Sequence, residues 1–154
     1  MNSTIDYMEQ LISFRKQGIP IPKGWKYSCI EDFVIKNGKN YTEIVPFWEK
    51  MKAPKECYKN AYSLSVGNKG LTYVEGYAKP KGLLVTLHAW CITEDEKVID
   101  PTWRNGVEYF GVPFNKKHVN KVLLKRKMYG ILDDWEDNFP LLRGVPKSVF
   151  IAKI

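Results

Sequence analysis

The chain has 154 residues, with 24 lysines and arginines against 17 aspartates and glutamates, a net charge of +7. A chain of this length typically forms one compact domain, and its 44% hydrophobic content excludes intrinsic disorder. No apolar run approaches the roughly 18 residues that a membrane helix needs, and the polar start MNSTIDYMEQ predicts no signal peptide. We therefore expect a cytoplasmic protein without membrane contact, whose three cysteines are free thiols.

Residues 1–53 are predicted to be mainly helical. Helical spacing over 4–17 predicts a helix that Ser3 caps and Gly18 ends, and one face of it is formed by Ile5, Met8, Leu11, Ile12 and Arg15. The segment IPIPKGW is a proline-punctuated connector. Ser28 and Glu31 have capping-box spacing, which predicts a short helix ending near Gly38. Cys29 falls in the first turn of this helix, where the pKa of a thiol can be lowered. With no histidine near it in sequence, we interpret Cys29 as structural.

Residues 54–114 are predicted to form a helix followed by an antiparallel sheet. The helix spans about 55–65, after Pro54 and closed around Gly67. Alternation with aromatic and β-branched residues then predicts strands, and the apolar stretch LLVTLHAWCIT is typical of a central one. The expected strands are 71–78, 83–93, 97–103 and 109–114, with a turn at 94–96. Pro101 is expected to disturb the third of these strands.

Residues 115–154 are predicted to form a basic helix and an extended tail. Asn115 caps a helix over 116–128, which contains Lys116, Lys117, Lys121, Lys125, Arg126 and Lys127. The acidic segment 133–137 follows directly, so a solvated amphipathic helix explains the charge better than a phosphate-binding surface. No zinc-finger spacing or phosphate-binding glycine loop points to nucleic acid. The last residues, 139–154, are expected to be extended and turn, and the whole chain is predicted to be one α+β domain.

Three residues on successive predicted elements have the chemistry of a cysteine nucleophile. Cys57 lies just inside a helix N-terminus, where unpaired N–H groups favour a thiolate. His88 lies on the central strand, and an imidazole beside a thiol takes its proton and later returns it to the leaving group. Asp100 lies on the next strand, where a carboxylate can fix the tautomer and orientation of the ring.

The loop between the two strands decides whether His88 and Asp100 share a face. A three-residue loop centred on Asp95 places His88 opposite Thr102 and makes Asp100 a diagonal neighbour, roughly 7 Å away. A five-residue loop centred on Glu94 places the two residues directly opposite each other. Any loop of even length separates them. The spacing therefore permits the pair without requiring it.

Each of the three residues also has an ordinary structural explanation. A cysteine near a helix start is usually a small buried hydrophobe, and a histidine in a buried strand is usually a core residue with its hydrogen bonds satisfied. An aspartate before proline is often a turn former. The occurrence of all three in this order is much less easily explained by chance, so we favour a catalytic interpretation.

The phrases around these residues resemble the core motifs of the transglutaminase-like superfamily, which belongs to the papain-like cysteine enzymes. They are Glu56-Cys57-Tyr58, His88-Ala89-Trp90 and the run from Val98 to Trp103 with its Asp-Pro-Thr. The resemblance covers about residues 54–114 and extends to small uncharacterised proteins of phages and bacteria. It implies a papain-like core in which the helix bearing Cys57 packs on a sheet bearing His88 and Asp100.

By position, the resemblance makes Cys57 the nucleophile, His88 the general base and acid, and Asp100 the orienting residue. The implied reaction is acyl transfer, and hydrolysis of a peptide or small amide is expected because no amine-acceptor site is evident.

One departure concerns the oxyanion hole. Papain-type enzymes have a glutamine six residues before the nucleophile, but this position is Met51 here. The backbone N–H of Cys57 supplies one donor. The second is left open among Trp48, Tyr41, Asn40 and Asn60.

Two further residues are candidates for substrate binding beside Asn60. Trp90 shares the strand face of His88 and either walls the site or packs in the core. Glu75 is unusual in an aromatic strand and either faces the cleft or lies on an exposed strand face.

The remaining histidine and cysteine are expected to be structural. Cys91 should point to the face opposite His88, into the core, and His118 should lie on the surface. No short paired ligand spacing predicts a metal, and no organic cofactor is implied.

Two other functions remain open. One is a non-catalytic binding module that uses the basic helix 116–128 to contact an acidic partner. The other is a Cys-His enzyme acting on a nucleotide or another small molecule. The sequence carries no signal for an oligomeric state.

Overall fold

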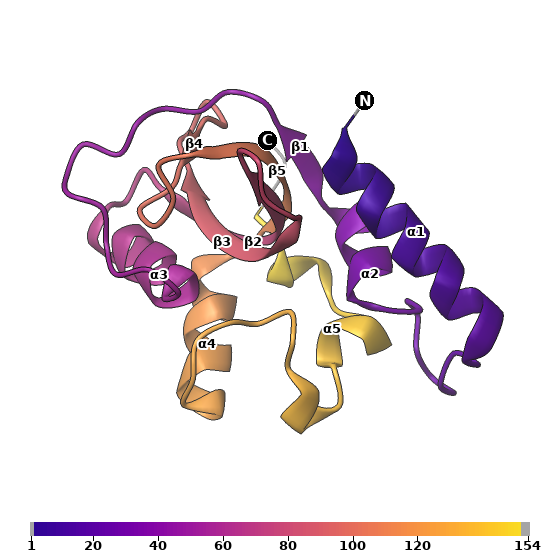
Figure 1. The fold of residues 1–154 in the computed structure, drawn as a ribbon. Coiled ribbons are helices and arrows are strands. Elements are labelled where there is room, and N and C mark those ends of the chain that lie inside the picture. Colours follow the sequence, from indigo (N-terminus) through magenta and orange to yellow (C-terminus); the bar gives the residue numbers. More distant parts are fainter. Residues whose placement is uncertain (1, 152–154) are drawn as a thin grey trace.

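A curled, five-stranded antiparallel sheet lies at the centre of the molecule (Figure 1). The computed structural model describes residues 2–151. The strand order is β1-β5-β2-β3-β4, so β2 and β3 are interior strands. The strands are β1 (Lys39–Tyr41), β2 (Thr72–Pro80), β3 (Thr86–Ile92), β4 (Val98–Ile99) and β5 (Gly106–Pro113). The α+β class expected from the sequence is confirmed.

The helices surround this sheet. Helix α3 (Cys57–Gly67) packs on β3 and β2, whereas α1 (Ser3–Gly18) and α2 (Ile30–Asn37) pack together on the other side of the molecule (Figure 1). Helix α4 (Lys116–Arg126) and the short α5 (Pro140–Arg143) lie below the sheet in this view. Two 3-10 turns, η1 (Trp135–Asp137) and η2 (Lys147–Val149), complete the described structure.

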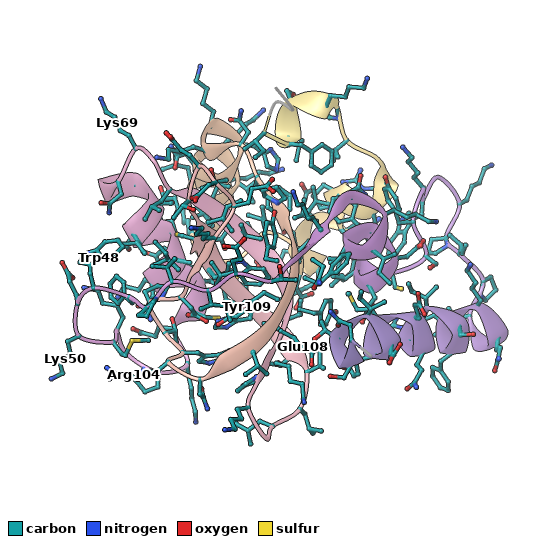
Figure 2. The ribbon with its side chains drawn as sticks, turned by 90° about the horizontal axis from the view of Figure 1, so that it is seen from above. Trp48, Lys50, Lys69, Arg104, Glu108 and Tyr109 are labelled. Atoms are coloured by element: carbon teal, nitrogen blue, oxygen red, sulfur yellow. The ribbon has the colours of Figure 1, made fainter. Side chains whose placement is uncertain are left out.

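The first two helices differ from expectation at their caps. Asn2, rather than Ser3, caps α1 by accepting the N–H groups of Thr4 and Ile5. The start of α1 is also tied to β5, because Glu108 accepts bonds from the Ser3 hydroxyl and the Thr4 N–H (Figure 2).

The predicted capping box of α2 is wrong by one residue. Cys29 is the N-cap and makes no side-chain cap bond, and the reciprocal contact runs from the Ser28 N–H to Asp32. A carboxylate at the third helical position therefore still binds an N–H that precedes the helix.

The β3–β4 hairpin has the three-residue loop centred on Asp95. Cys91 pairs with Ile99 and Ile92 with Val98, which extrapolates to His88 opposite Thr102. Glu96 supplies the left-handed residue that such loops need, at φ 62°. The loop is odd in length, so His88 and Asp100 fall on one face, as diagonal neighbours.

The predicted lengths of the helices and strands differ from the structure more than their predicted types do. Helix α3 starts and ends two residues later than predicted, β5 starts three residues earlier, and β4 stops before Asp100. Strand β1 was not predicted, because three residues give no periodicity. The C-terminal segment contains α5 and η2, so its prediction as extended and turn is wrong there. Residues 152–154 of that prediction lie outside the described part.

The sheet face that carries His88 has its own small core. Val74, Trp90 and Tyr109 pack there together with Tyr41 and Ile92. Gly111 leaves room for Trp90, since a Cβ at this position would lie 2.7 Å from the indole ring. The opposite face packs against the helices and contains Ala89, Cys91 and Val112. Among residues 2–151, no helix has both the length and the apolar character to cross a membrane.

Candidate active site

Cys57 is the first residue of α3, with Glu56 as the N-cap. The thiol is half-buried, whereas Cys29 and Cys91 are fully buried. A residue at the first helical position lies beside backbone N–H groups that have no partner within the helix, and these stabilise negative charge. The local geometry is therefore suited to a thiolate at this position.

His88 on β3 and Asp100, the residue directly after β4, form a buried pair. The imidazole Nε2 lies 2.7 Å from Asp100 Oδ2, and the two residues are 1% and 4% exposed. An ionised carboxylate can only accept, so Nε2 is the protonated nitrogen. This leaves Nδ1 of the neutral ring with a free lone pair, which is the requirement for a base.

Asp100 accepts two hydrogen bonds on each oxygen. Oδ1 accepts the N–H groups of Thr102 (2.9 Å) and Trp103 (3.0 Å). Oδ2 accepts the Tyr109 hydroxyl at 2.8 Å in addition to His88. Four donors fill the acceptor capacity of a carboxylate, so the orientation of Asp100 is fixed on both oxygens. Nothing in the sequence connects Tyr109 with this site, because Tyr109 lies on β5, two strands away from β3.

Two rings enclose His88. Trp103 stacks face to face on the imidazole, with ring centroids 3.6 Å apart and planes 11° apart, and Trp90 lies behind it at 6.1 Å. Burial disfavours the imidazolium, but hydrogen bonds to Asp100 and to the Cys57 thiol outweigh it, and the pKa of His88 is raised above its ordinary value. The structure thus pairs His88 with Asp100, and the Cys57 thiol lies close enough to affect the pKa of His88.

Asn60 connects the Cys57 helix to the Asp100 turn. It lies one turn after Cys57 and donates to the Ala53 carbonyl (2.9 Å) and to the Thr102 hydroxyl (3.0 Å). The Lys52 N–H also binds the Pro101 carbonyl at 2.8 Å. Both amide protons of Asn60 are therefore used within the protein, which favours positioning of Cys57 over contact with substrate.

The other two residues considered for substrate binding are buried. Trp90 is fully buried, so the core-packing alternative applies to it. Glu75 is 1% exposed, so the expectation of an exposed strand face is wrong. Its carboxylate accepts the Tyr73 hydroxyl and the N–H groups of Ile131 and Leu132. Because its three donors all lie within the protein, the Glu75 carboxylate stabilises the fold at this position.

The upstream candidates for the second oxyanion donor are not suitably placed. The Tyr41 hydroxyl is buried in the Trp90 core, and Asn40 lies on β1, at the opposite edge of the sheet from β4. The exposed Trp48 lines a groove of about 520 Å³ with Gly70 and Glu94. Gly70 follows the C-terminal end of α3, and an 11-residue helix puts that end roughly 15 Å from Cys57. The N–H of Cys57 remains the one assigned donor.

The remaining histidine and thiols are placed largely as predicted. Cys91 points to the helix-covered face and lies 3.2 Å from the Ala61 carbonyl, and burial raises its pKa to about 12. Burial also raises the pKa of Cys29, so its helix start does not make it reactive. His118 is half-buried against Phe114 rather than fully on the surface, and burial lowers its pKa.

The basic helix is shorter and less available than its sequence indicates. It ends at Arg126 rather than at residue 128. Lys116 donates to the Ser65 carbonyl, Lys125 pairs with Asp137 at 2.9 Å, and Arg126 is buried against Asp134. Half of the six basic side chains therefore already have partners in the fold, whereas Lys117, Lys121 and Lys127 are exposed.

Comparison with known proteins adds no relative to this picture. No family model, no curated protein and no solved structure matches the chain. Among residues 2–151, no group of three or more His, Cys, Asp or Glu side chains is arranged to hold a metal ion.

Proposed function

We propose that the protein is a cysteine-dependent acyl-transfer enzyme that hydrolyses a peptide or small amide bond. The observation that carries the proposal is the buried His88–Asp100 bond at 2.7 Å, which leaves the other ring nitrogen for the half-exposed Cys57 thiol. Core packing alone would explain the environment of His88 only if the neighbouring Cys57 thiol were unreactive.

The proposed reaction has two stages. His88 Nδ1 takes the Cys57 proton, and the thiolate attacks the carbonyl carbon of the amide to form a C–S bond. The C–N bond then breaks as the imidazolium gives its proton to the leaving amine. In the second stage His88 removes a proton from water, the resulting hydroxide attacks the thioester, and the carboxylic acid and the thiol are released.

Asp100 keeps the ring oriented throughout these steps. Its bond to Nε2 stabilises the imidazolium that forms, while Tyr109, Thr102 and Trp103 prevent the carboxylate from rotating. The Cys57 N–H donates to the oxyanion of the tetrahedral intermediate. A transglutaminase-like core, with Cys57 on a helix against a sheet that carries His88, is the fold that we propose for this arrangement.

Covalent trapping tests the proposal. The protein is mixed with p-nitrophenyl acetate at pH 7, and an acetyl group on Cys57 is located by mass spectrometry. We expect rapid release of one equivalent of nitrophenol and a slower turnover, and Cys57→Ser and His88→Ala should each abolish the rapid phase. A rapid phase that survives His88→Ala contradicts the assigned base. The nearby Asp95→Asn variant, on the exposed hairpin loop, serves as the folded control.

A further inference from the structure

A buried carboxylate that the proposed mechanism does not use holds a surface segment in place. Glu75 is 1% exposed on the helix-covered face of β2. Its oxygens accept the N–H groups of Ile131 (2.7 Å) and Leu132 (2.9 Å) and the Tyr73 hydroxyl (2.5 Å). Burying a charge costs several kcal/mol unless it is well hydrogen-bonded, and here two of the three donors belong to the segment 130–133.

A buried cation holds the same segment through its carbonyl groups. Arg126, whose side chain is 5% exposed, donates to the carbonyls of Gly130 (2.7 Å) and Asp133 (3.1 Å). Its guanidinium also lies 3.2 Å from the Asp134 carboxylate. A buried anion and a buried cation therefore fix the backbone of residues 130–133, which connects α4 to η1.

The segment lies along α3 and runs toward Cys57. Tyr129 packs on Tyr62, with ring centroids 6.0 Å apart, and Gly130 packs against the ring of Tyr58, one turn nearer the helix start. Gly130 has φ +98°, a conformation that favours glycine. Tyr58 directly follows Cys57, so Gly130 lies beside the first turn of α3. Burial, together with the neighbouring charges of Glu75, Cys57 and Asp133, raises the pKa of Tyr58.

Asp133 is the exposed carboxylate at the end of this segment. The acidic residues that follow have cationic partners: Asp134 and Glu136 pair with Arg126, and Asp137 pairs with Lys125. Within residues 2–151, Asp133 has no lysine, arginine or histidine within 4 Å. Its backbone carbonyl is held by Arg126, so Asp133 presents an exposed carboxylate that has no cationic partner among these residues.

We propose that residues 130–133 form one wall of the substrate site and that Asp133 binds a lysine- or arginine-like cation next to the amide that Cys57 attacks. This inference rests on the proposed function and adds a substrate class to it. Glu75 and Arg126 act as positioning residues, because they fix the wall without reaching the substrate.

Positive charges also lie on the segments next to Asn60 and Asp100. Lys50 and Arg104 are exposed on segments that the Lys52–Pro101 hydrogen bond joins, and Figure 2 shows both on the side of Trp48. If the positive charges of Lys50 and Arg104 dominate the electrostatic potential at the site, the site attracts anions instead. A comparison of charged thiol reagents therefore separates the two possibilities.

The test uses three methanethiosulfonates, which attach an aminoethyl, a hydroxyethyl or a sulfonatoethyl group to a thiol. Their rates at Cys57 are measured by mass spectrometry at pH 7 and low salt. We expect the cationic reagent to react fastest relative to the neutral one, and Asp133→Asn should lower this ratio roughly three- to fivefold. The effect should shrink in 0.5 M salt. Glu75→Gln should also lower the ratio, because the wall loses its anchor.

Glu9→Gln is the matched control, since it removes the same charge from an exposed position of α1, on the far side of the molecule (Figure 1). A ratio that falls in Asp133→Asn and not in Glu9→Gln supports the inference. An unchanged ratio in Asp133→Asn, or a wild type that prefers the anionic reagent, overturns it while Cys57 stays reactive. A Cys57 that reacts no faster than Cys29 or Cys91 instead refutes the proposed function.

Discussion

Tyr109 provides a test of the hydrogen-bond network behind the proposed catalytic histidine. The substitution Tyr109→Phe removes only the hydroxyl that donates to Asp100 Oδ2 at 2.8 Å and leaves the buried ring in place. A hydrogen bond to a charged group contributes about 1.5–3 kcal/mol. Because no cavity is created and three donors to Asp100 remain, we expect the free energy of unfolding to decrease by an amount within that range. For a chain of this length, this is a loss of roughly 2–4 °C in Tm per kcal/mol.

The same substitution has a functional consequence with a definite sign. Oδ2 also accepts the bond from His88, so an Asp100 without the tyrosine donor interacts more strongly with the imidazolium. The imidazolium should then persist to higher pH, and the thiolate–imidazolium form should be favoured over the neutral pair. We expect Cys57 alkylation near neutral pH to become faster relative to its rate at high pH, by up to about tenfold, where tenfold corresponds to about 1.4 kcal/mol.

The assay combines urea denaturation with iodoacetamide rates measured from pH 4 to 9. Tyr62→Phe is the matched control, because it removes a hydroxyl that donates to the neutral Asn120 side chain at 2.7 Å. It should cost about 1 kcal/mol and leave the pH profile unchanged. If Tyr109→Phe moves neither the unfolding free energy nor the pH profile beyond Tyr62→Phe, the reasoning about Asp100 is refuted.

Three further predictions concern His88, Asn60 and Gly111. Because the pKa of His88 is raised in the folded protein, its stabilising contribution is fully present below about pH 6.5 and is lost as the pH rises through the folded pKa. Urea titrations should therefore show the wild type losing stability relative to His88→Gln above pH 6.5. Parallel stability curves for the two proteins would contradict this. Asn60→Ala should lower the unfolding free energy by about 1–3 kcal/mol and also slow Cys57 alkylation, whereas a loss of stability alone would argue against a positioning role. Gly111→Ala should destabilise by about 1–3 kcal/mol in chemical denaturation, because its Cβ would meet the Trp90 ring at 2.7 Å and the Glu75 carbonyl at 2.8 Å; an unchanged midpoint would show that the strands shift freely.

The sequence permitted His88 and Asp100 to share a face without requiring it, because strand pairing follows a strict period of two. Only loops of odd length place both residues on one face, and the observed loop centred on Asp95 is one of the two that were considered. Helix α3 was predictable because Pro54 and Gly67 bracket a helical segment. The alternation of apolar residues likewise identified β2 and β3.

Contacts that depend on curvature were not predictable in the same way. Tyr109 is nine residues from Asp100 in sequence, on a strand that pairs with β1 and β2, and reaches it because the sheet is curled (Figure 1). Alternation along a strand contains no information on curvature. The burial of Glu75 had a signal, a single charge in an aromatic strand, but its partners are backbone N–H groups of Ile131 and Leu132, which no residue type reveals.

The central claim is that His88 activates Cys57, and one measurement tests it most directly. All three cysteines are quantified by mass spectrometry after limited exposure to iodoacetamide at pH 6, in wild type and in His88→Ala. We predict that Cys57 reacts at least tenfold faster than Cys29 and Cys91, and that His88→Ala removes this advantage. A Cys57 that reacts no faster than the two buried thiols, or that reacts equally fast without His88, would contradict the account.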